Sequence, residues 1–325
     1  MSVQELDLVA TFLDVGHGDA IVLRFREGHQ VRTVVVDGGG PAHAGRLLSY
    51  LQRCGTEVVD LMVATHVDRH HIAGLLPVAE AEQIKIECFL GPACESTQPS
   101  VAGLRLPDER AYQRLFSRIH SRVRPERILS PVRGMPLPPL FGEATITVLH
   151  PGTTNLLRAA PQDAPARRPQ DLVVEQNELS LVLHIEAHGI RLLLGGDAQA
   201  TFWTAAAAER TMSRYLDVNI LKVPHYGRPT GLPAALALSG AVRTEYAVFS
   251  LSAKLDKVPA PDLVRAFRET PTEVLCTEHA VHPPFCANPY CHAAVSGQDI
   301  VFCRCRGDSS YSTSAEHCPA SAEPA

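Results

Sequence analysis

Short apolar runs that end in a polar or charged residue recur along this chain of 325 residues. Runs of about four to eight residues, rich in Val, Ile and Leu and bounded by Gly, Asp or Pro, are typical of buried strands. A side chain that follows such a strand lies at the edge of the sheet, where ligands bind in open α/β sheets. We therefore expect the ends of several strands to lie at one shared site. Four of the runs end at a carboxylate or imidazole side chain that could contribute to such a site: Asp37, His150, Asp197 and His225.

The predicted elements form two similar halves. Strands are expected in the first half at Leu6–Val15, Ala20–Arg26, Val31–Asp37, Val59–His66 and Lys85–Leu90, with helices at Ala44–Cys54 and Asp108–Arg124. The second half has strands at Thr145–His150, Leu179–Ala187, Ile190–Gly195, Val218–Pro224 and Tyr246–Leu251, with helices at Gln199–Tyr215 and Pro261–Glu269. Two runs of strands interleaved with helices favour an α/β fold with two packed sheets and helices outside.

Composition favours one large globular domain. Hydrophobic residues make up 45% of the chain, enough to fill a core, and the formal charge of −5 gives no overall basic field that would attract nucleic acid. No apolar run approaches the ~20 residues that span a bilayer, and no signal peptide is visible, so we expect a cytoplasmic protein that is not membrane-bound. We expect one domain over residues 1–306, a surface insertion at 155–178 and a disordered tail at 307–325.

The densest group of polar residues is THVDRHHIAG at Thr65–Gly74, directly after an apolar run. Imidazole and carboxylate groups are the ligands that divalent zinc, manganese or iron prefer. Without a cation, groups packed this closely would repel or desolvate one another. The alternative is an exposed polar turn that is rich in histidine. The metal interpretation gives ligand roles to His66, Asp68, His70 and His71.

The other strand ends offer further ligands. Asp197 follows an apolar run and two glycines, and His225 follows a run and a proline. His150 precedes Pro-Gly and could equally be a turn residue. Asp37 could cap a turn, but the three glycines after it allow the backbone to approach a site closely.

A series of motifs follows in order between residue 12 and about residue 230: FLDVGHGDA at Phe12–Ala20, VVDGGG at Val35–Gly40, THVDRHHIAG, VLHPG, NELSLVLHIE at Asn177–Glu186, LLLGGDA and ILKVPHYG. This series resembles the metallo-β-lactamase fold superfamily. It is most similar to the hydrolase domain of ComEC-type competence proteins and their stand-alone relatives. The resemblance implies a four-layer αββα sandwich with one or two divalent metal ions at the edge of the sheets, zinc being expected first and manganese or iron as alternatives.

The resemblance also implies which residues hold the metals. The ligands of a first ion would be His66, Asp68 and His150. Those of a second ion, bridged to the first by Asp197, would be His70, His71 and His225. Two positions depart from the family pattern, because His70 stands where Asp is usual and Tyr226 where a second His is usual. Either a modified two-metal centre or a single retained metal fits these departures.

Other residues are expected to support the site. Asp14 would hold the geometry of the first loop, Asp37 would lie beside the centre, and Tyr226 would line it. His17, where the family has Gln, could line the pocket as well.

The chemistry expected of such a centre is hydrolysis. Water bound to a metal ion has a pKa of about 7, and cations also neutralise charge on a phosphate, which favours a phosphodiesterase or nuclease acting on nucleic acid or a nucleotide. The catalytic residues would be Asp68, Asp197 and Lys222, with Arg69 or Arg228 as further phosphate contacts. The alternatives are an acyl hydrolase (a lactonase, thioesterase or β-lactamase-like enzyme) and a degenerate binding or regulatory module. Protein partners in a multi-gene bacterial system are a further expectation.

The segment from Cys276 to Cys305 is rich in Cys and His. Its spacing lacks a C-x₂-C pair, so free thiols, a structural zinc and a disulfide all remain open. The zinc ligands would be Cys276, Cys286, Cys291 and Cys303.

Overall fold

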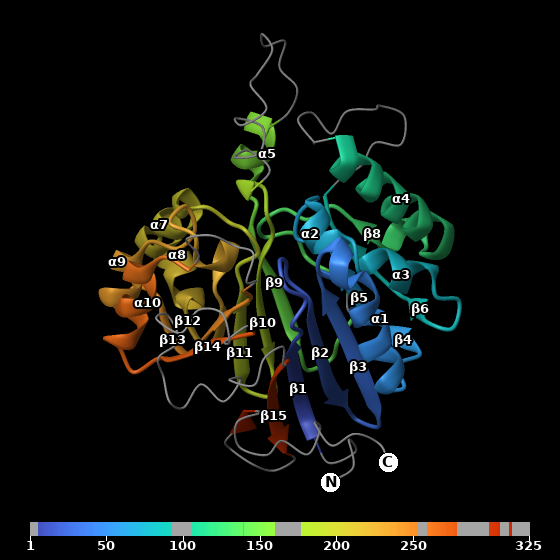
Figure 1. Cartoon of the computed structure of the whole chain (residues 1–325), viewed down its shortest axis with the longest axis horizontal. Coiled ribbons are helices and arrows are strands. Elements are labelled where there is room, and N and C mark those ends of the chain that lie inside the picture. The colour runs from blue at the N-terminus through green and yellow to red at the C-terminus, as the bar shows by residue number, and fades with distance from the viewer. Residues whose placement is uncertain are drawn as a thin grey trace.

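The computed structural model describes residues 6–92, 106–138, 140–159, 177–251, 259–277, 299–305 and 312–313. Two mixed β-sheets lie against one another in the middle of the molecule, and helices cover the outer face of each (Figure 1). The four-layer αββα sandwich predicted from the sequence is therefore confirmed. None of the helices within these ranges combines the length and apolar character that a bilayer span requires.

The larger sheet has eight strands, in the order β16 (Ser312–Thr313), β15 (Ile300–Cys305), β1 (Leu6–Phe12), β2 (Ile21–Glu27), β3 (Gln30–Val36), β5 (Leu61–Val63), β7 (Phe89–Leu90) and β8 (Ile128–Leu129). Strands β15 to β3 pair antiparallel, whereas β3, β5, β7 and β8 run parallel. A separate pair joins β4 (Val58–Val59) to β6 (Lys85–Ile86).

The second sheet has six strands, in the order β14 (Glu273–Cys276), β13 (Arg243–Phe249), β12 (Asp217–Lys222), β11 (Ile190–Leu194), β10 (Val182–Ala187) and β9 (Thr145–His150). Strands β11 to β14 are parallel, and β9 and β10 complete the sheet in antiparallel pairs. Because the carboxyl ends of parallel strands meet at one edge, the loops after β3, β5, β11 and β12 are brought together there.

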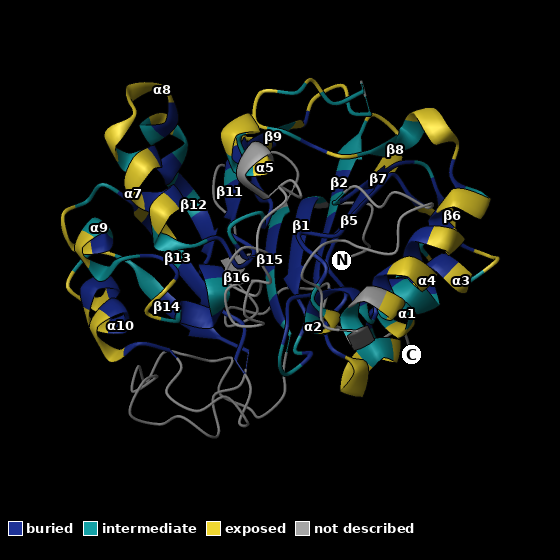
Figure 2. Cartoon of the chain, turned by 90° about the horizontal axis from the view of Figure 1, so that it is seen from above, coloured by how far each residue is buried: buried dark blue, intermediate teal, exposed yellow. Residues whose placement is uncertain are grey.

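Alternation along the strands separates the apolar layers. In β2 and β3, Leu23 and Val34 face the core between the sheets, while Val22 and Val35 face the outer helices. Figure 2 shows the strands as the buried interior and the helices as its partly exposed cover. The helices on the larger sheet are α1 (Ala44–Arg53), α2 (Arg69–Ile72), α3 (Leu75–Glu80) and α4 (Leu106–Arg122); those elsewhere are α5 (Thr153–Ala159), α7 (Ala200–Ala208), α8 (Arg210–Ser213), α9 (Ala234–Leu238) and α10 (Pro261–Arg268).

Three predicted elements are divided in the structure. The strand expected at Val59–His66 is split between β4 and β5, because the Asp60 side chain accepts a hydrogen bond from the Thr33 backbone N–H (2.8 Å) where the chain passes from one sheet to the other. The strand expected at Lys85–Leu90 is likewise divided into β6 and β7. The helix expected at Gln199–Tyr215 breaks at Glu209, which has extended backbone angles.

The predicted insertion and tail differ in part from the structure. Helix α5 includes the first residues of the expected insertion, and residues 160–176 lie outside the described ranges. In the expected tail, Ser312 and Thr313 form β16, which pairs with β15. The expectation of a wholly disordered tail is therefore wrong at these two residues, since they add a strand to the larger sheet.

Candidate metal centre

Four side chains from both sheets meet at the shared edge. His66 follows β5, His70 and His71 lie on α2, and Asp197 follows β11. One ligand atom from each of them lies within 4.8 Å of those from the others. The segments were expected to converge, and the structure brings Asp197 beside histidines that lie at least 126 positions earlier in the chain.

The Asp197 carboxylate is the centre of this cluster. Its Oδ1 lies 3.4 Å from His71 Nε2, and its Oδ2 lies 3.7 Å from His66 Nε2 and 3.8 Å from His70 Nε2. The Nε2 atom of His225, from the turn after β12, is 3.7 Å from the same Oδ2. Four imidazole nitrogens thus surround one carboxylate at distances longer than an ordinary hydrogen bond.

The unpaired atoms of the cluster test whether it suits a cation. His66 Nε2 and both carboxylate oxygens of Asp197 are buried and have no hydrogen-bond partner within the described residues. A buried polar atom without a partner is unfavourable, and a buried carboxylate more so. A divalent ion held by these nitrogens and oxygens would satisfy all three atoms, so the residues present fit a metal of the zinc, manganese or iron class.

Asp37 organises the cluster from behind. Its carboxylate accepts hydrogen bonds from the Thr65 N–H (2.8 Å), the Thr65 hydroxyl (2.7 Å) and His71 Nδ1 (2.7 Å). The bond to Nδ1 leaves His71 Nε2 directed toward Asp197. A carboxylate behind a histidine in this way fixes the ring and its tautomer for metal binding. These hydrogen bonds place the Asp37 carboxylate directly behind the His71 ring.

Burial and neighbouring charges shift the pKa values in the centre. Burial, together with His71, lowers the pKa of His66 to about 3, so its ring is neutral and able to bind a metal. Burial alone would lower the pKa of His71, but Asp197 and Asp37 raise it well above its usual value. Burial would raise the pKa of Asp197, but His71 and His225 lower it well below its usual range, so this carboxylate is ionised.

Asp68 and His225 lie at the rim of the cluster. Asp68 precedes α2, and its Oδ2 is 3.8 Å from His66 Nε2 and 3.9 Å from His70 Nε2. The His225 ring has Nδ1 3.2 Å from the Thr230 hydroxyl. Both residues therefore lie next to the four-residue cluster without belonging to it.

Tyr226 and His17 close one side of the cluster. The Tyr226 hydroxyl is hydrogen-bonded to His71 Nε2, and the His17 ring is stacked on His70 with ring centroids 4.1 Å apart. Burial and the carboxylate of Asp197 raise the pKa of Tyr226 well above its usual value, so the hydroxyl keeps its proton. The Tyr226 hydroxyl therefore shares His71 Nε2 with the Asp197 carboxylate, whose Oδ1 lies 3.4 Å from the same nitrogen.

Glycines allow the loops to approach α2. A side chain at Gly18 would place its Cβ 1.7 Å from the His70 carbonyl oxygen, and Gly18 also has a positive φ of 119°. A Cβ at Gly74 would lie 1.8 Å from the Gly38 carbonyl oxygen. Gly18 in the first motif and Gly74 in the third are therefore needed for the first loop and the loop after β3 to lie against the segment that carries α2.

His150 does not join the cluster. Its Nε2 donates a hydrogen bond to the Glu178 carbonyl (2.6 Å), and its ring packs against Phe202 on α7. In the described part of the chain, no hydrogen bond or ion pair connects it with Asp197 or His66. The first-metal set expected from the resemblance, with His150 as third ligand, is therefore not assembled, because the end of β9 turns this ring toward α7.

Lys222 is also placed differently from the expectation. Its side chain is fully buried, with Nζ 2.9 Å from Asp19 Oδ1 and 2.9 Å from the Val223 carbonyl. A buried and paired ammonium group is not available to a phosphate from solvent. We therefore correct its expected catalytic role to a structural one, in which it ties β12 to the first loop. In that loop Asp14 accepts a hydrogen bond from the Gly16 N–H (3.2 Å).

The cysteine segment shows no metal site in the described residues. Cys276 is buried at the end of β14, whereas Cys303 is disulfide-bonded and lies on β15 of the other sheet. A cysteine in a disulfide has no thiolate to bind zinc, so the expected four-cysteine site loses Cys303. Cys286 and Cys291 lie outside the described ranges.

One supporting residue was not singled out from the sequence, and a second buried polar residue lies near it in the chain. The Ser180 hydroxyl accepts a hydrogen bond from the Asp197 N–H (2.9 Å) and lies 3.4 Å from His66 Nδ1. Asn177 is buried, and its Oδ1 has no hydrogen-bond partner among the described residues. Both belong to the NELSLVLHIE motif, so a polar residue directly before a buried strand was the signal available.

Comparisons with known proteins find structural similarity only. No protein-family model and no curated protein matches the chain. The metallo-β-lactamase fold protein YhfI from Bacillus subtilis is 13% identical, and the match covers 83% of this chain and 96% of that one with a TM-score of 0.46. A diphosphatase of the PhnP family is 14% identical, with 79% and 80% covered and a TM-score of 0.41. A mutant of the CmlA β-hydroxylase is 15% identical, with 82% and 52% covered and a TM-score of 0.47.

Proposed function

We propose that this chain is a metal-dependent hydrolase that cleaves phosphodiesters, with nucleic acid or a nucleotide as substrate. The observation that carries the proposal is the buried cluster of His66, His70, His71 and Asp197, whose ligand atoms lie within 4.8 Å of one another. A divalent ion held there would lower the pKa of bound water to about 7 and so supply a hydroxide nucleophile at neutral pH.

The charges beside the cluster favour an anionic substrate. The Arg228 guanidinium is close enough to His17 and His225 to lower the pKa of both rings, although burial is the largest cause for each. Arg69, next to His70, is exposed. Guanidinium groups such as these can form paired hydrogen bonds with non-bridging phosphate oxygens, which a neutral acyl substrate lacks.

The remaining residues have supporting roles in this proposal. Asp37 holds the His71 ring in place, and Ser180 holds the backbone of Asp197. His17 and Tyr226 cover one side of the cluster and limit the access of water to it. These contacts keep the ligands in a fixed geometry before substrate arrives.

The test combines metal content with turnover. The purified chain would be stripped with a chelator, reloaded with Zn²⁺, Mn²⁺ or Fe²⁺, and assayed on bis(p-nitrophenyl) phosphate, single- and double-stranded oligonucleotides, cyclic nucleotides and acyl esters. Asp197→Asn and His66→Ala are expected to lose bound metal and to lower turnover by more than about 100-fold, because mutation of residues that only orient metal ligands already costs up to about 100-fold. Asp217→Asn, which changes an exposed carboxylate on β12, is the matched control and is expected to retain both.

Three results would overturn the proposal. Turnover of esters but of no phosphodiester would indicate an acyl hydrolase. A chain that takes up no metal would indicate a binding or regulatory module. Unchanged turnover in Asp197→Asn would show that the cluster is not the active centre.

A further inference from the structure

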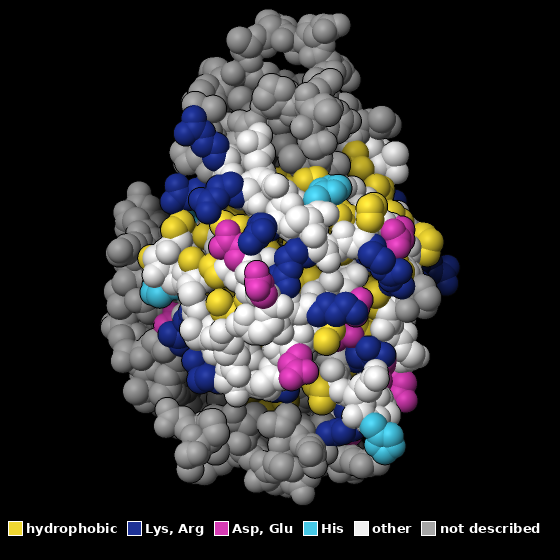
Figure 3. All heavy atoms as spheres, turned by 90° about the vertical axis from the view of Figure 1, so that its right-hand side faces the viewer, with side chains coloured by type: hydrophobic (Ala, Val, Ile, Leu, Met, Phe, Trp, Pro, Cys, Tyr) yellow, Lys and Arg dark blue, Asp and Glu magenta, His cyan; other side chains and the backbone are white. Residues whose placement is uncertain are grey.

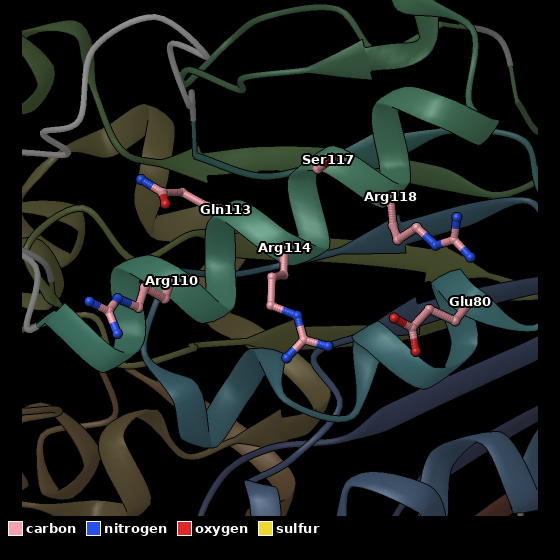
Figure 4. A pocket seen from close by; sticks show the side chains of 6 residues that line it. All are labelled: Glu80, Arg110, Gln113, Arg114, Ser117 and Arg118. Carbon is pink, nitrogen blue, oxygen red and sulfur yellow. The ribbon is translucent and has the colours of Figure 1, made fainter.

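A row of arginines lies on the outer face of α4. Arg110, Arg114 and Arg118 are spaced by four residues, so they occupy successive turns of one helix face, about 6 Å apart along its axis. All three are exposed, and with Gln113, Ser117 and Glu80 they line a shallow groove of about 490 Å³ (Figure 4). We call Arg110, Arg114 and Arg118 the arginine row.

The arginine row is unpaired within the described residues. No ion pair joins any of its three guanidinium groups to a carboxylate, even though Glu80 lines the same groove. Like charges four residues apart on a helix destabilise it slightly. A row of this kind with no acidic partner is the arrangement expected where the partner is an external anion.

The fourth residue in the same spacing shows the contrast. Arg122 donates hydrogen bonds to the carbonyl oxygens of Ala79 (2.7 Å), Ala81 (3.0 Å) and Ile84 (2.8 Å), where α3 ends. This side chain fixes α4 to α3, and the buried Tyr112, Leu115 and Ile119 fix it to the sheet. The arginine row therefore lies on a helix that is fixed to both α3 and the larger sheet.

The row begins beside the metal centre. Asp108, in the first turn of α4, accepts a hydrogen bond from the Arg69 N–H of α2 (3.3 Å). Burial raises the pKa of the Asp108 carboxyl, and the nearby charge of Asp68 raises it further. Arg110 follows two residues later. From there the row extends for eight residues, or about 12 Å, away from the cluster. Figure 3 shows the side of the molecule that carries these helices, where basic side chains alternate with fewer acidic ones.

We propose that the arginine row binds the backbone of a nucleic-acid strand and leads it to the metal centre. The inference rests on the proposed phosphodiesterase function and narrows its substrate from any phosphodiester to a polynucleotide. Guanidinium groups about 6 Å apart contact successive backbone phosphates without contacting bases, so binding is independent of base sequence. A mononucleotide or a small diester bound at the centre is too short to extend along the whole ~12 Å of the row.

The test compares two variants of equal charge change. The variant R110Q/R114Q/R118Q removes the row, and R53Q/R210Q/R265Q removes three exposed arginines from α1, α8 and α10. Binding of a fluorescein-labelled, twelve-nucleotide single strand would be followed by anisotropy between 50 and 300 mM salt. Each lost phosphate contact reduces the salt slope of a single strand by about 0.7, so removal of the row is expected to weaken binding about 10-fold or more and to reduce the slope by about 2. The second variant is expected to behave as wild type.

The outcomes separate this proposal from the proposed function. Equal losses in both variants, or no loss in the first, would overturn the arginine row as a binding surface. Absence of strand binding by wild type would overturn it as well. Hydrolysis of bis(p-nitrophenyl) phosphate reports the metal centre separately, so a chain that binds the strand but cleaves no diester contradicts only the proposed function.

Discussion

At the scale of single residues, the site depends on a few hydrogen bonds that fix imidazole rings. Asp37 has a positive φ of 58° and is fully buried. Its carboxylate accepts hydrogen bonds from both Thr65 and His71. A non-glycine residue in this conformation persists only where its surroundings impose it. The position of the Asp37 carboxylate is therefore fixed by its hydrogen bonds to Thr65 and His71. The orientation of His71, a candidate metal ligand, depends on the same hydrogen bonds.

Replacement of this carboxylate tests the dependence. Asp37→Asn replaces one acceptor oxygen with a donor, so it cannot accept from the Thr65 N–H, the Thr65 hydroxyl and His71 Nδ1 together. We expect Zn²⁺ affinity, measured by isothermal titration, to fall about 10- to 100-fold. The control is Asp60→Asn, the same substitution at another buried carboxylate, which accepts hydrogen bonds from the Arg32 side chain and the Thr33 N–H. We expect this variant to keep wild-type Zn²⁺ affinity. Equal affinity in Asp37→Asn and wild type would show that His71 needs no such support.

At the scale of elements, β10 carries a histidine in an apolar strand. His184 is 6% exposed and packs edge-on against Tyr215, with ring centroids 5.0 Å apart. Burial, followed by the charges of Arg191 and Arg214, lowers its pKa to about 4. The ring is therefore neutral in the folded chain over a pH range in which the unfolded chain already binds a proton.

This difference predicts how stability depends on pH. The unfolded chain protonates His184 below about pH 6.5 and the folded chain only near pH 4, so stability is lost as the pH falls through this window, by up to about 3 kcal/mol. The free energy of unfolding would be measured by urea denaturation of the metal-free protein at pH 7.5, 6 and 5. We expect His184→Phe to lose less of this free energy than wild type as the pH falls. His120→Phe, at an exposed position on α4, is the control. An identical pH dependence in His184→Phe and wild type would contradict the prediction.

At the scale of the whole molecule, the candidate centre joins the two sheets. His66 follows a strand of the larger sheet, and Asp197 and His225 follow strands of the second. An ion bound by residues of both sheets binds the folded chain and not the unfolded one. Metal binding is therefore expected to stabilise the whole fold.

Chelation tests this link without reference to turnover. At a free metal concentration about 100 times Kd, the stabilisation is about 2.7 kcal/mol, which corresponds to several degrees in Tm. We expect Tm, measured by calorimetry, to fall on addition of EDTA and to recover with Zn²⁺. The Tm of Asp197→Asn is expected to change little or not at all on either addition. A wild-type Tm that is unchanged by both EDTA and Zn²⁺ would contradict a metal ion bound between the two sheets.

Much of the architecture follows from local sequence patterns. Alternating and continuous apolar runs indicate strands from only a few residues. They predicted most strands of both sheets, although not β8, β14 or β16, together with helices α4 and α10. Strand ends predicted where His66, Asp197 and His225 would lie, because a polar residue after a buried run can only be at the edge of a sheet. The resemblance added the layer arrangement, which the structure confirms.

The sequence alone determined which segments reach the site, since that depends on where each apolar run stops. Only the tertiary structure decided which side chains take part, because this depends on how each one turns among neighbours distant in the chain. His150 ends a strand as Asp197 does, yet packing against Phe202 directs it elsewhere. Lys222 looks like a phosphate ligand until Asp19, about two hundred residues earlier, is seen to neutralise it in the core. The contact of Tyr226 with His71 likewise exists only once the two sheets have packed.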